Sequence, residues 1–202
     1  ADPRKEEATM YVNNTYRQQE VYLSMANRVT VLPFWDINLS VDYQWNKLNA
    51  NLTDFPYPRR NTTLVAAATS LHFDRFKFQA SVLGTFVHEN VASDTTSAGN
   101  KMEFTPTAIA SYKPFKNIDF NLRAFYKRIF RMPTLNDLYY TFIGNIKLKP
   151  EYTNQYNIGF TYQKLFTGTW LQALNVQLDA YYNEVENKII ATPTNNFFRW
   201  TM

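Results

Sequence analysis

The sequence predicts an all-β fold, an antiparallel up-and-down transmembrane β-barrel that is present as about 9–10 strands. Three observations predict it. Polar and apolar residues alternate along several segments, the links between these segments are short and long in turn, and aromatic residues gather at the short links. Residues 1–202 are therefore interpreted as one partial barrel domain.

Alternation with a period of two is typical of a strand whose two faces meet different surroundings. In segment 36–46, Leu39 and Val41 share an apolar face while Asn38 and Ser40 share a polar one. The pattern recurs, with Phe125 as a misfit, in 76–89, 117–129, 151–164 and 171–183, and less regularly in 20–31, 62–72 and 102–113. The polar face is predicted to line a barrel interior and to include Asp42, Asp119, Arg123, Lys127 and Asp179.

The links are the second observation. Residues 32–35, 73–75, 114–116 and 165–170 form short links, whereas 47–61, 90–101, 130–150 and 184–195 form long ones. Short and long links alternate without exception. A membrane barrel has short periplasmic turns and long extracellular loops, which a soluble β-sandwich does not require.

Aromatic residues at the short links are the third observation. Turns of water-soluble proteins favour Gly, Asn, Asp, Ser and Pro, but here the rings indicate a girdle at lipid headgroup depth. The residues are Phe34, Trp35, Phe73, Phe76, Phe115, Phe166 and Trp170. Residues 10–16 and 196–202 are also strand-like, so the chain reads as part of a longer barrel.

Several functions are excluded by composition. The chain has no Cys, and its net charge of +4 comes without a basic run, so thiol chemistry and nucleic-acid binding are not expected. No hydrolase, phosphate-loop or dinucleotide motif is present, so we expect no enzyme and no cofactor. The two imidazoles predict no metal site: His72 is expected to face inward near a short turn, and His88 to lie on the apolar side.

A specific motif lies in the longest link. Residues 130–140 read FRMPTLNDLYY, and they are followed by Gly144-Asn145, by LKPE at 148–151 and by YYNEVENKI at 181–189. This order resembles the C-terminal half of TonB-dependent outer-membrane receptors, closely over about residues 130–190. The resemblance implies structural roles for Arg131, Pro133, Asn136, Leu138, Gly144, Asn145, Lys149, Pro150 and Glu151.

The resemblance also implies a biological setting. The family fold is a barrel of about 22 strands filled by a plug domain, in the bacterial outer membrane. Such receptors take up ferric siderophores, haem, cobalamin or glycans, energised by the TonB complex acting on the plug. The present sequence has no plug segment and too few strands, so the plug and the remaining strands are expected outside residues 1–202.

Residues of two predicted extracellular loops are candidates for contact with a small-molecule or glycan ligand. They are Tyr57, Arg59, Arg60, Tyr139, Tyr140 and Phe142. Guanidinium groups bind anions and stack on rings. The alternatives are that the arginines bind anionic headgroup sugars or are solvated, and that the aromatic rings pack the loop onto the barrel rim.

Two other classes remain open from the sequence. A small outer-membrane enzyme barrel would require acid–base residues clustered at the rim, and the shortage of His counts against it. A soluble all-β carbohydrate-binding module would also show alternation and loop aromatics. A second layer of protein over the apolar face would favour that module.

Overall fold

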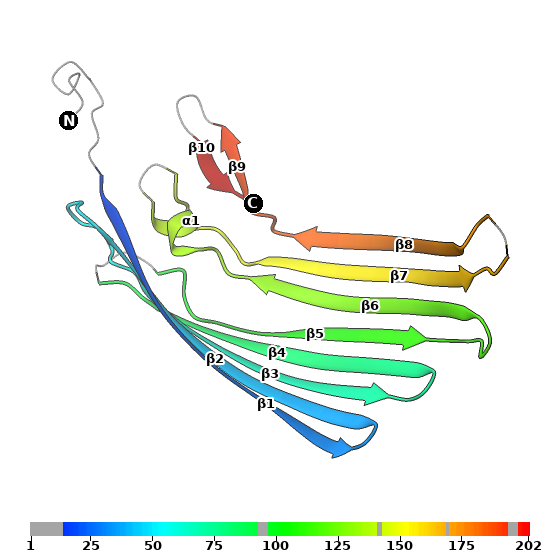
Figure 1. Ribbon diagram of the computed structural model, residues 1–202. Coiled ribbons are helices and arrows are strands. Elements are labelled where there is room, and N and C mark those ends of the chain that lie inside the picture. The colour runs from blue at the N-terminus through cyan, green and yellow to red at the C-terminus, as the bar shows by residue number, and fades with distance from the viewer. Residues whose placement is uncertain (1–13, 93–96, 141–142, 169, 194–197) are drawn as a thin grey trace.

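The computed structural model describes residues 14–92, 97–140, 143–168, 170–193 and 198–202. Its main feature is one curved antiparallel sheet in which each strand pairs with the next along the chain (Figure 1). The eight strands are β1 (Tyr16–Leu32), β2 (Trp35–Ala50), β3 (Arg59–His72), β4 (Phe76–Asn90), β5 (Lys101–Tyr112), β6 (Asp119–Arg131), β7 (Glu151–Leu165) and β8 (Ala173–Glu186). The predicted up-and-down topology is confirmed.

Short and long connections lie at opposite ends of the sheet. The turns from β1 to β2, β3 to β4, β5 to β6 and β7 to β8 lie together at the right of Figure 1, and the longer connections lie at the left. The predicted loop 47–61 was too long, because Lys47 pairs with Arg59 and Arg59 with Asn90. Arg59 and Arg60 therefore belong to β3.

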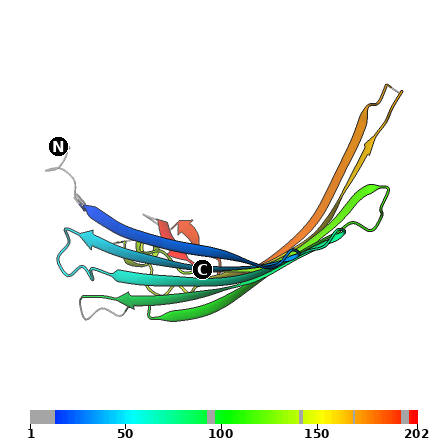
Figure 2. The ribbon, with the colours of Figure 1, turned by 60° about the horizontal axis from the view of Figure 1, so that its bottom comes forward.

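The register places the predicted interior residues on one face of the sheet, the face that also carries Gln44 and Arg60, which line a cavity beside α1 (Leu135–Tyr139). The sheet is curved (Figure 2), and we call this the concave face. Gly159 of β7 lies between Arg123 of β6 and Asp179 of β8 in register. Arg123 Nη2 reaches across it to Asp179 Oδ1 at 2.8 Å. A Cβ atom on Gly159 would lie 2.7 Å from the carbonyl oxygen of Leu178, so this close approach requires glycine.

The convex face carries apolar side chains with no described element packed over them. Met25 is 65% exposed, Leu39 52%, Ile158 65% and Leu178 62%. Among the described residues, each strand of the sheet makes its main contacts with its sheet neighbours. A soluble module would need a second layer here, and the described part of the chain supplies none, so this face suits hydrocarbon.

Several aromatic residues at the short turns contact neighbouring side chains. Phe34 stacks on Phe73 with 5.3 Å between ring centroids, and Phe76 stacks on Phe78 at 6.4 Å. Trp35 donates from Nε1 to Thr69 Oγ1 at 2.8 Å. Rings therefore gather at the short-turn end, and their position at lipid headgroup depth stays a prediction.

Helix α1 and strand β9 (Ile190–Pro193) were not predicted. The helix begins after Thr134, whose side chain accepts from the Asp137 amide while the Asp137 side chain accepts from the Thr134 amide. Strands β9 and β10 (Phe198–Thr201) form a separate two-stranded sheet. The strand predicted at 196–202 thus exists as β10, but its partner is β9. Of the strand-like segment 10–16, residues 10–13 lie outside the described residues.

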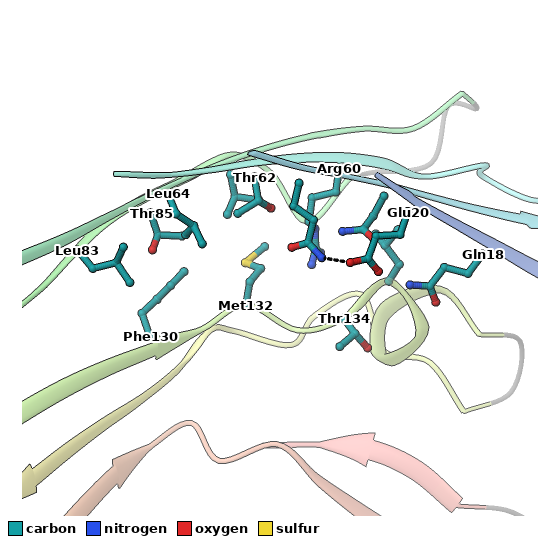
Figure 3. A pocket seen from close by; sticks show the side chains of 14 residues that line it. Gln18, Glu20, Arg60, Thr62, Leu64, Leu83, Thr85, Phe130, Met132 and Thr134 are labelled. Carbon is teal, nitrogen blue, oxygen red and sulfur yellow. Dashed lines mark hydrogen bonds between the residues drawn. The ribbon is translucent and has the colours of Figure 1, made fainter. Parts of the chain in front are cut away.

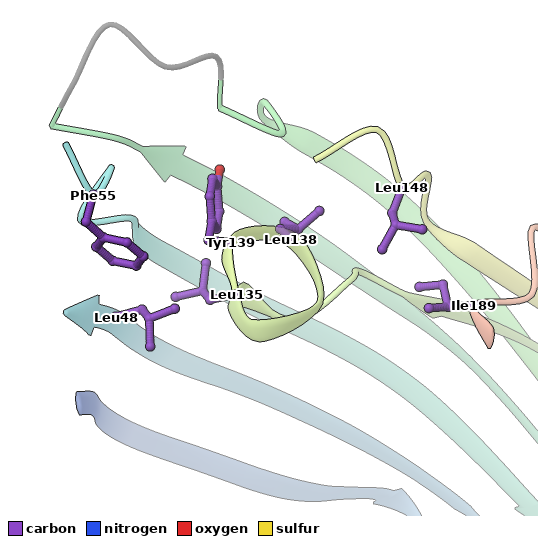
Figure 4. Packing of buried hydrophobic residues seen from close by; sticks show 7 residues of the cluster. All are labelled: Leu48, Phe55, Leu135, Leu138, Tyr139, Leu148 and Ile189. Atoms are coloured by element: carbon purple, nitrogen blue, oxygen red, sulfur yellow. The ribbon is translucent and has the colours of Figure 1, made fainter. Parts of the chain in front are cut away.

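No helix in the described part of the chain has the length and apolar character needed to cross a membrane. Helix α1 has five residues and lies at the loop end of the sheet (Figure 1). Its buried side chains join a cluster of buried apolar residues, shown in Figure 4. The cluster consists of Leu48, Phe55, Leu135, Leu138, Tyr139, Leu148 and Ile189. It fixes the segment after β6 against the concave face.

Candidate functional site

A cavity of about 490 Å³ lies between the concave face and the segment that leads from β6 into α1 (Figure 3). Glu20 of β1 and Gln44 of β2 line its polar wall, and Gln44 Nε2 donates to Glu20 Oε1 at 2.6 Å. Phe130 and Met132 line the opposite side. The cavity thus combines one hydrogen-bonding wall with one apolar wall, an arrangement that suits binding of a mixed polar and apolar surface.

A buried ion pair forms one border of this cavity. Arg60 donates from Nε and Nη2 to Glu89 Oε2, at 2.9 and 2.6 Å. Its Nη1 donates to the carbonyl oxygen of Pro133 at 2.6 Å. The Glu89 side chain is fully buried and that of Arg60 is 8% exposed. The pair therefore joins β3 and β4 to the segment that precedes α1.

Tyr139 completes this network from α1. Its hydroxyl donates to Glu89 Oε1, and the Ala98 amide approaches both Tyr139 Oη and Glu89 Oε1 at 3.3 Å. Burial raises the pKa of Tyr139, and the hydrogen bond to the Glu89 carboxylate raises it further. The phenol therefore keeps its proton and remains a donor. We call Arg60, Glu89 and Tyr139 the loop anchor.

The first half of the family-like motif shapes α1. Pro133 is fully buried, and its carbonyl oxygen accepts a hydrogen bond from Arg60. Arg131 Nη2 lies 3.9 Å from Asp137 Oδ2, and Leu138 is buried in the apolar cluster. Asn136 Nδ2 is 3.5 Å from Gln18 Oε1 on β1. These contacts hold the helix across the inner wall.

The second half of the motif holds the return to the sheet. Gly144 approaches the α1 backbone so closely that a Cβ atom would lie 2.6 Å from Tyr140 O. Asn145 donates to the carbonyl oxygen of Trp200 at 3.1 Å. Glu151 accepts from the Ile189 amide at 3.0 Å. Lys149 and Pro150 also contact the C-terminal segment. The Lys149 amide donates to Met202 Sδ, and the Pro150 carbonyl oxygen accepts from Asn187 Nδ2.

The predicted ligand contacts separate into four groups. Arg60 and Tyr139 are buried, and their polar groups already bind Glu89. Arg59 lies on the convex face, because it alternates with Arg60 along β3. Tyr57, 38% exposed, packs edge-on against Phe55, and the Tyr140 ring lies 4.1 Å from that of Tyr16. Phe142 lies outside the described residues.

The two histidines do not share a site. His72 Nε2 lies 3.5 Å from Asp36 Oδ2 on the concave face near a short turn, as its predicted position requires. His88 pairs with Asn61 on the convex face at the loop end. Within the described residues, no group of three or more His, Asp or Glu side chains is close enough to hold a metal ion.

Glu89 is the residue that sequence reasoning missed. It lies near the end of β4, where the alternating pattern puts residue 89 on the polar face together with Thr85 and Val87. That pattern indicates an inward carboxylate. Its pairing with Arg60 follows from the register, in which Arg60 and Glu89 lie directly opposite each other.

Comparison with known proteins identifies the fold's family. Residues 6–201 match the family model described as "TonB dependent receptor-like, beta-barrel". The chain belongs to this family. It is a family of receptors and transporters of the outer membrane and not of enzymes, so neither the enzyme barrel nor the soluble module is retained.

Individual relatives agree with this assignment. The chain is 26% identical over 182 residues to the vitamin B12 transporter BtuB of Vibrio vulnificus (strain YJ016), covering 89% of this chain and 27% of that protein. The hemophore receptor HasR of Serratia marcescens, solved with its hemophore HasA and heme, has a similar fold: TM-score 0.65, 12% identity, 93% of this chain and 37% of HasR. The copper transporter OprC matches with TM-score 0.68 and 16% identity over 93% of this chain and 32% of OprC. The chain thus spans about a quarter of the length of its curated relative.

Proposed function

We propose that this chain is part of the wall of an outer-membrane receptor that takes up a scarce nutrient with energy from the TonB complex. The main support is the family match over residues 6–201 together with an uncovered apolar face and a polar concave face. The concave face would enclose a plug domain, and we propose that residues outside 1–202 supply that domain and the remaining strands. TonB would act on that plug.

Within this receptor, the segment around α1 has two proposed roles. The first role is structural: Arg60 and Tyr139 hold the segment through Glu89, and the family-like motif residues stabilise the conformation of the same segment. Tyr57 and Tyr140, with Phe142, are the remaining candidates for ligand contact at the extracellular end. The cavity beneath α1 is then the place where the wall meets plug or ligand.

Ferric siderophores, haem, cobalamin and glycans are the substrate classes that we propose for the complete receptor. Cobalamin is the first to test, because one relative, 26% identical to this chain, is a vitamin B12 transporter. The test expresses the full-length receptor in cells that lack their own cobalamin receptor, and it measures uptake of labelled cobalamin with and without a protonophore. Ferric siderophores, haem and oligosaccharides follow in the same assay.

Energised uptake predicts accumulation of one class that collapses when the protonophore is added. Accumulation that persists without a proton gradient would contradict a TonB-driven mechanism. Failure to accumulate any of the four classes would contradict the proposed nutrient range.

A further inference from the structure

The convex face changes character toward the loop end of β1–β3. Along β2, the outward side chains run from Leu39 and Val41 through Tyr43 and Trp45 to Lys47. This is the order expected on crossing from hydrocarbon through the aromatic belt to the headgroups. With a rise of roughly 3.3 Å per residue, Lys47 lies about 7 Å beyond Trp45 along the strand.

Three cations occupy this level on neighbouring strands. Lys47 of β2 lies directly opposite Arg59 of β3, and Arg17 of β1 lies opposite Asn49, the next outward residue after Lys47. Arg17 and Arg59 are exposed and Lys47 is half-buried. We call Arg17, Lys47 and Arg59 the basic rim.

In the described part of the chain, no carboxylate lies opposite a member of the basic rim in the strand register. The residues opposite its members on the same face are uncharged: Gln19, Asn49 and Asn90. The nearby acids Glu20 and Glu89 face the other way, into the cavity wall and the loop anchor. Among the described residues, no ion pair involving the basic rim is formed.

Like charges placed directly opposite each other on neighbouring strands destabilise a sheet. Lys47 and Arg59 have this arrangement, and their Cβ atoms are expected about 4.5–5.5 Å apart. An anion between the two side chains would turn this repulsion into attraction. Guanidinium and ammonium groups together suit phosphate oxygens, since arginine binds them with paired hydrogen bonds and lysine as a point charge.

We propose that the basic rim binds the phosphate groups of an anionic lipid headgroup in the outer leaflet. Its position decides between a lipid and a soluble ligand. The three side chains leave the barrel wall on the convex side, above an aromatic belt and an apolar band, and the cavity lies on the opposite face. A phosphate held there would belong to a molecule whose acyl chains lie against Leu39 and Val41.

The test uses the full-length receptor in lipid nanodiscs. One variant replaces all three residues of the basic rim by Gln, and a charge-matched control carries Lys77→Gln, Lys116→Gln and Lys164→Gln at the short-turn end. Native mass spectrometry counts bound phosphorylated glycolipid and phosphatidylglycerol against phosphatidylcholine, and inorganic phosphate is titrated separately.

The expected loss is about fivefold in affinity for the anionic headgroup per removed charge, or on the order of a hundredfold for all three. The control variant should bind as the unmodified receptor does. If the triple variant does not insert, Lys47→Gln and Arg59→Gln singly should each weaken binding about fivefold. Equal lipid binding by variant and unmodified receptor would overturn the proposal, as would inorganic phosphate binding as tightly as the lipid.

Discussion

Removing the Glu89 carboxylate should release the segment around α1 from the barrel wall. In Glu89→Leu, Arg60 loses both hydrogen bonds to the carboxylate and keeps only Pro133 O, while its side chain remains 8% exposed. Breaking a buried pair in this way costs roughly 3–5 kcal/mol, because a charge is left without compensation. Tyr139 and the Ala98 amide also lose their acceptor.

The loss should appear locally, since the loop anchor joins one connecting segment to strands that are held by many other bonds. Amide hydrogen exchange in the full-length receptor is the direct measurement. The protected amides of Leu138, Tyr140 and Gly144, which donate within residues 134–144, should exchange about a hundred- to several-thousand-fold faster. Amides in the middle of β3 and β4 should keep their rates.

Two further variants separate charge burial from lost packing. The double variant Arg60→Met with Glu89→Leu leaves no unpaired charge and should therefore cost less than Glu89→Leu alone; its remaining cost comes from the Pro133 carbonyl and the Tyr139 hydroxyl, which both lose their partners. Glu103→Gln is the control, because Glu103 is 26% exposed and its nearest cation, Arg128, is 4.0 Å away. That change should cost less than about 1 kcal/mol. If Glu89→Leu exchanges no faster than this control, the loop anchor does not hold α1.

The other predictions concern single contacts. Folding raises the pKa of Tyr139 above its ordinary 10.0, so the protonated phenol should stabilise the fold fully below pH 10 and lose this effect as the pH rises further. In urea unfolding, the free energy of unfolding of Tyr139→Phe should therefore fall less at alkaline pH than that of the unmodified receptor. Gly159→Ala should cost about 1–3 kcal/mol in unfolding free energy, whereas Gly84→Ala, which meets only aromatic side chains, should cost less. Glu151→Ala removes the acceptor of the Ile189 amide and should make residues 187–193 more sensitive to limited proteolysis, and unchanged cleavage would refute that role.

The sheet was predictable because its physics is local. Each strand meets a polar and an apolar environment on its two faces, so the sequence must alternate, and a shift of one residue would reverse every side chain. Arg123 and Asp179 illustrate this: parity alone places them on the interior face, where they form an ion pair. The strand ends were less predictable. Arg59 belongs to β3 because it pairs with Lys47 of the neighbouring strand, and the alternation of polar and apolar residues does not show this pairing.

The site was less predictable, because its contacts join residues far apart in the sequence. Arg60 and Tyr139 were recognised as candidates for a ligand, yet the acceptor that occupies both is Glu89, 29 and 50 residues away. Helix α1 is likewise too short for helical periodicity to show. Only its capping residues, Thr134 and Asp137, mark it in the sequence.

The two basic positions at the start of β3 show how one strand serves two surroundings. Arg60 faces inward and is neutralised by Glu89 within the protein, because a buried charge is stable only when it is paired. Arg59, one residue earlier, faces outward and has no such partner in the described structure, although Lys47 lies opposite. An arginine on the inner face thus needs a counterion from the protein, and an arginine on the outer face needs one from its surroundings. The wall at this level is charged on both sides, and it is the membrane that must supply the second set of anions.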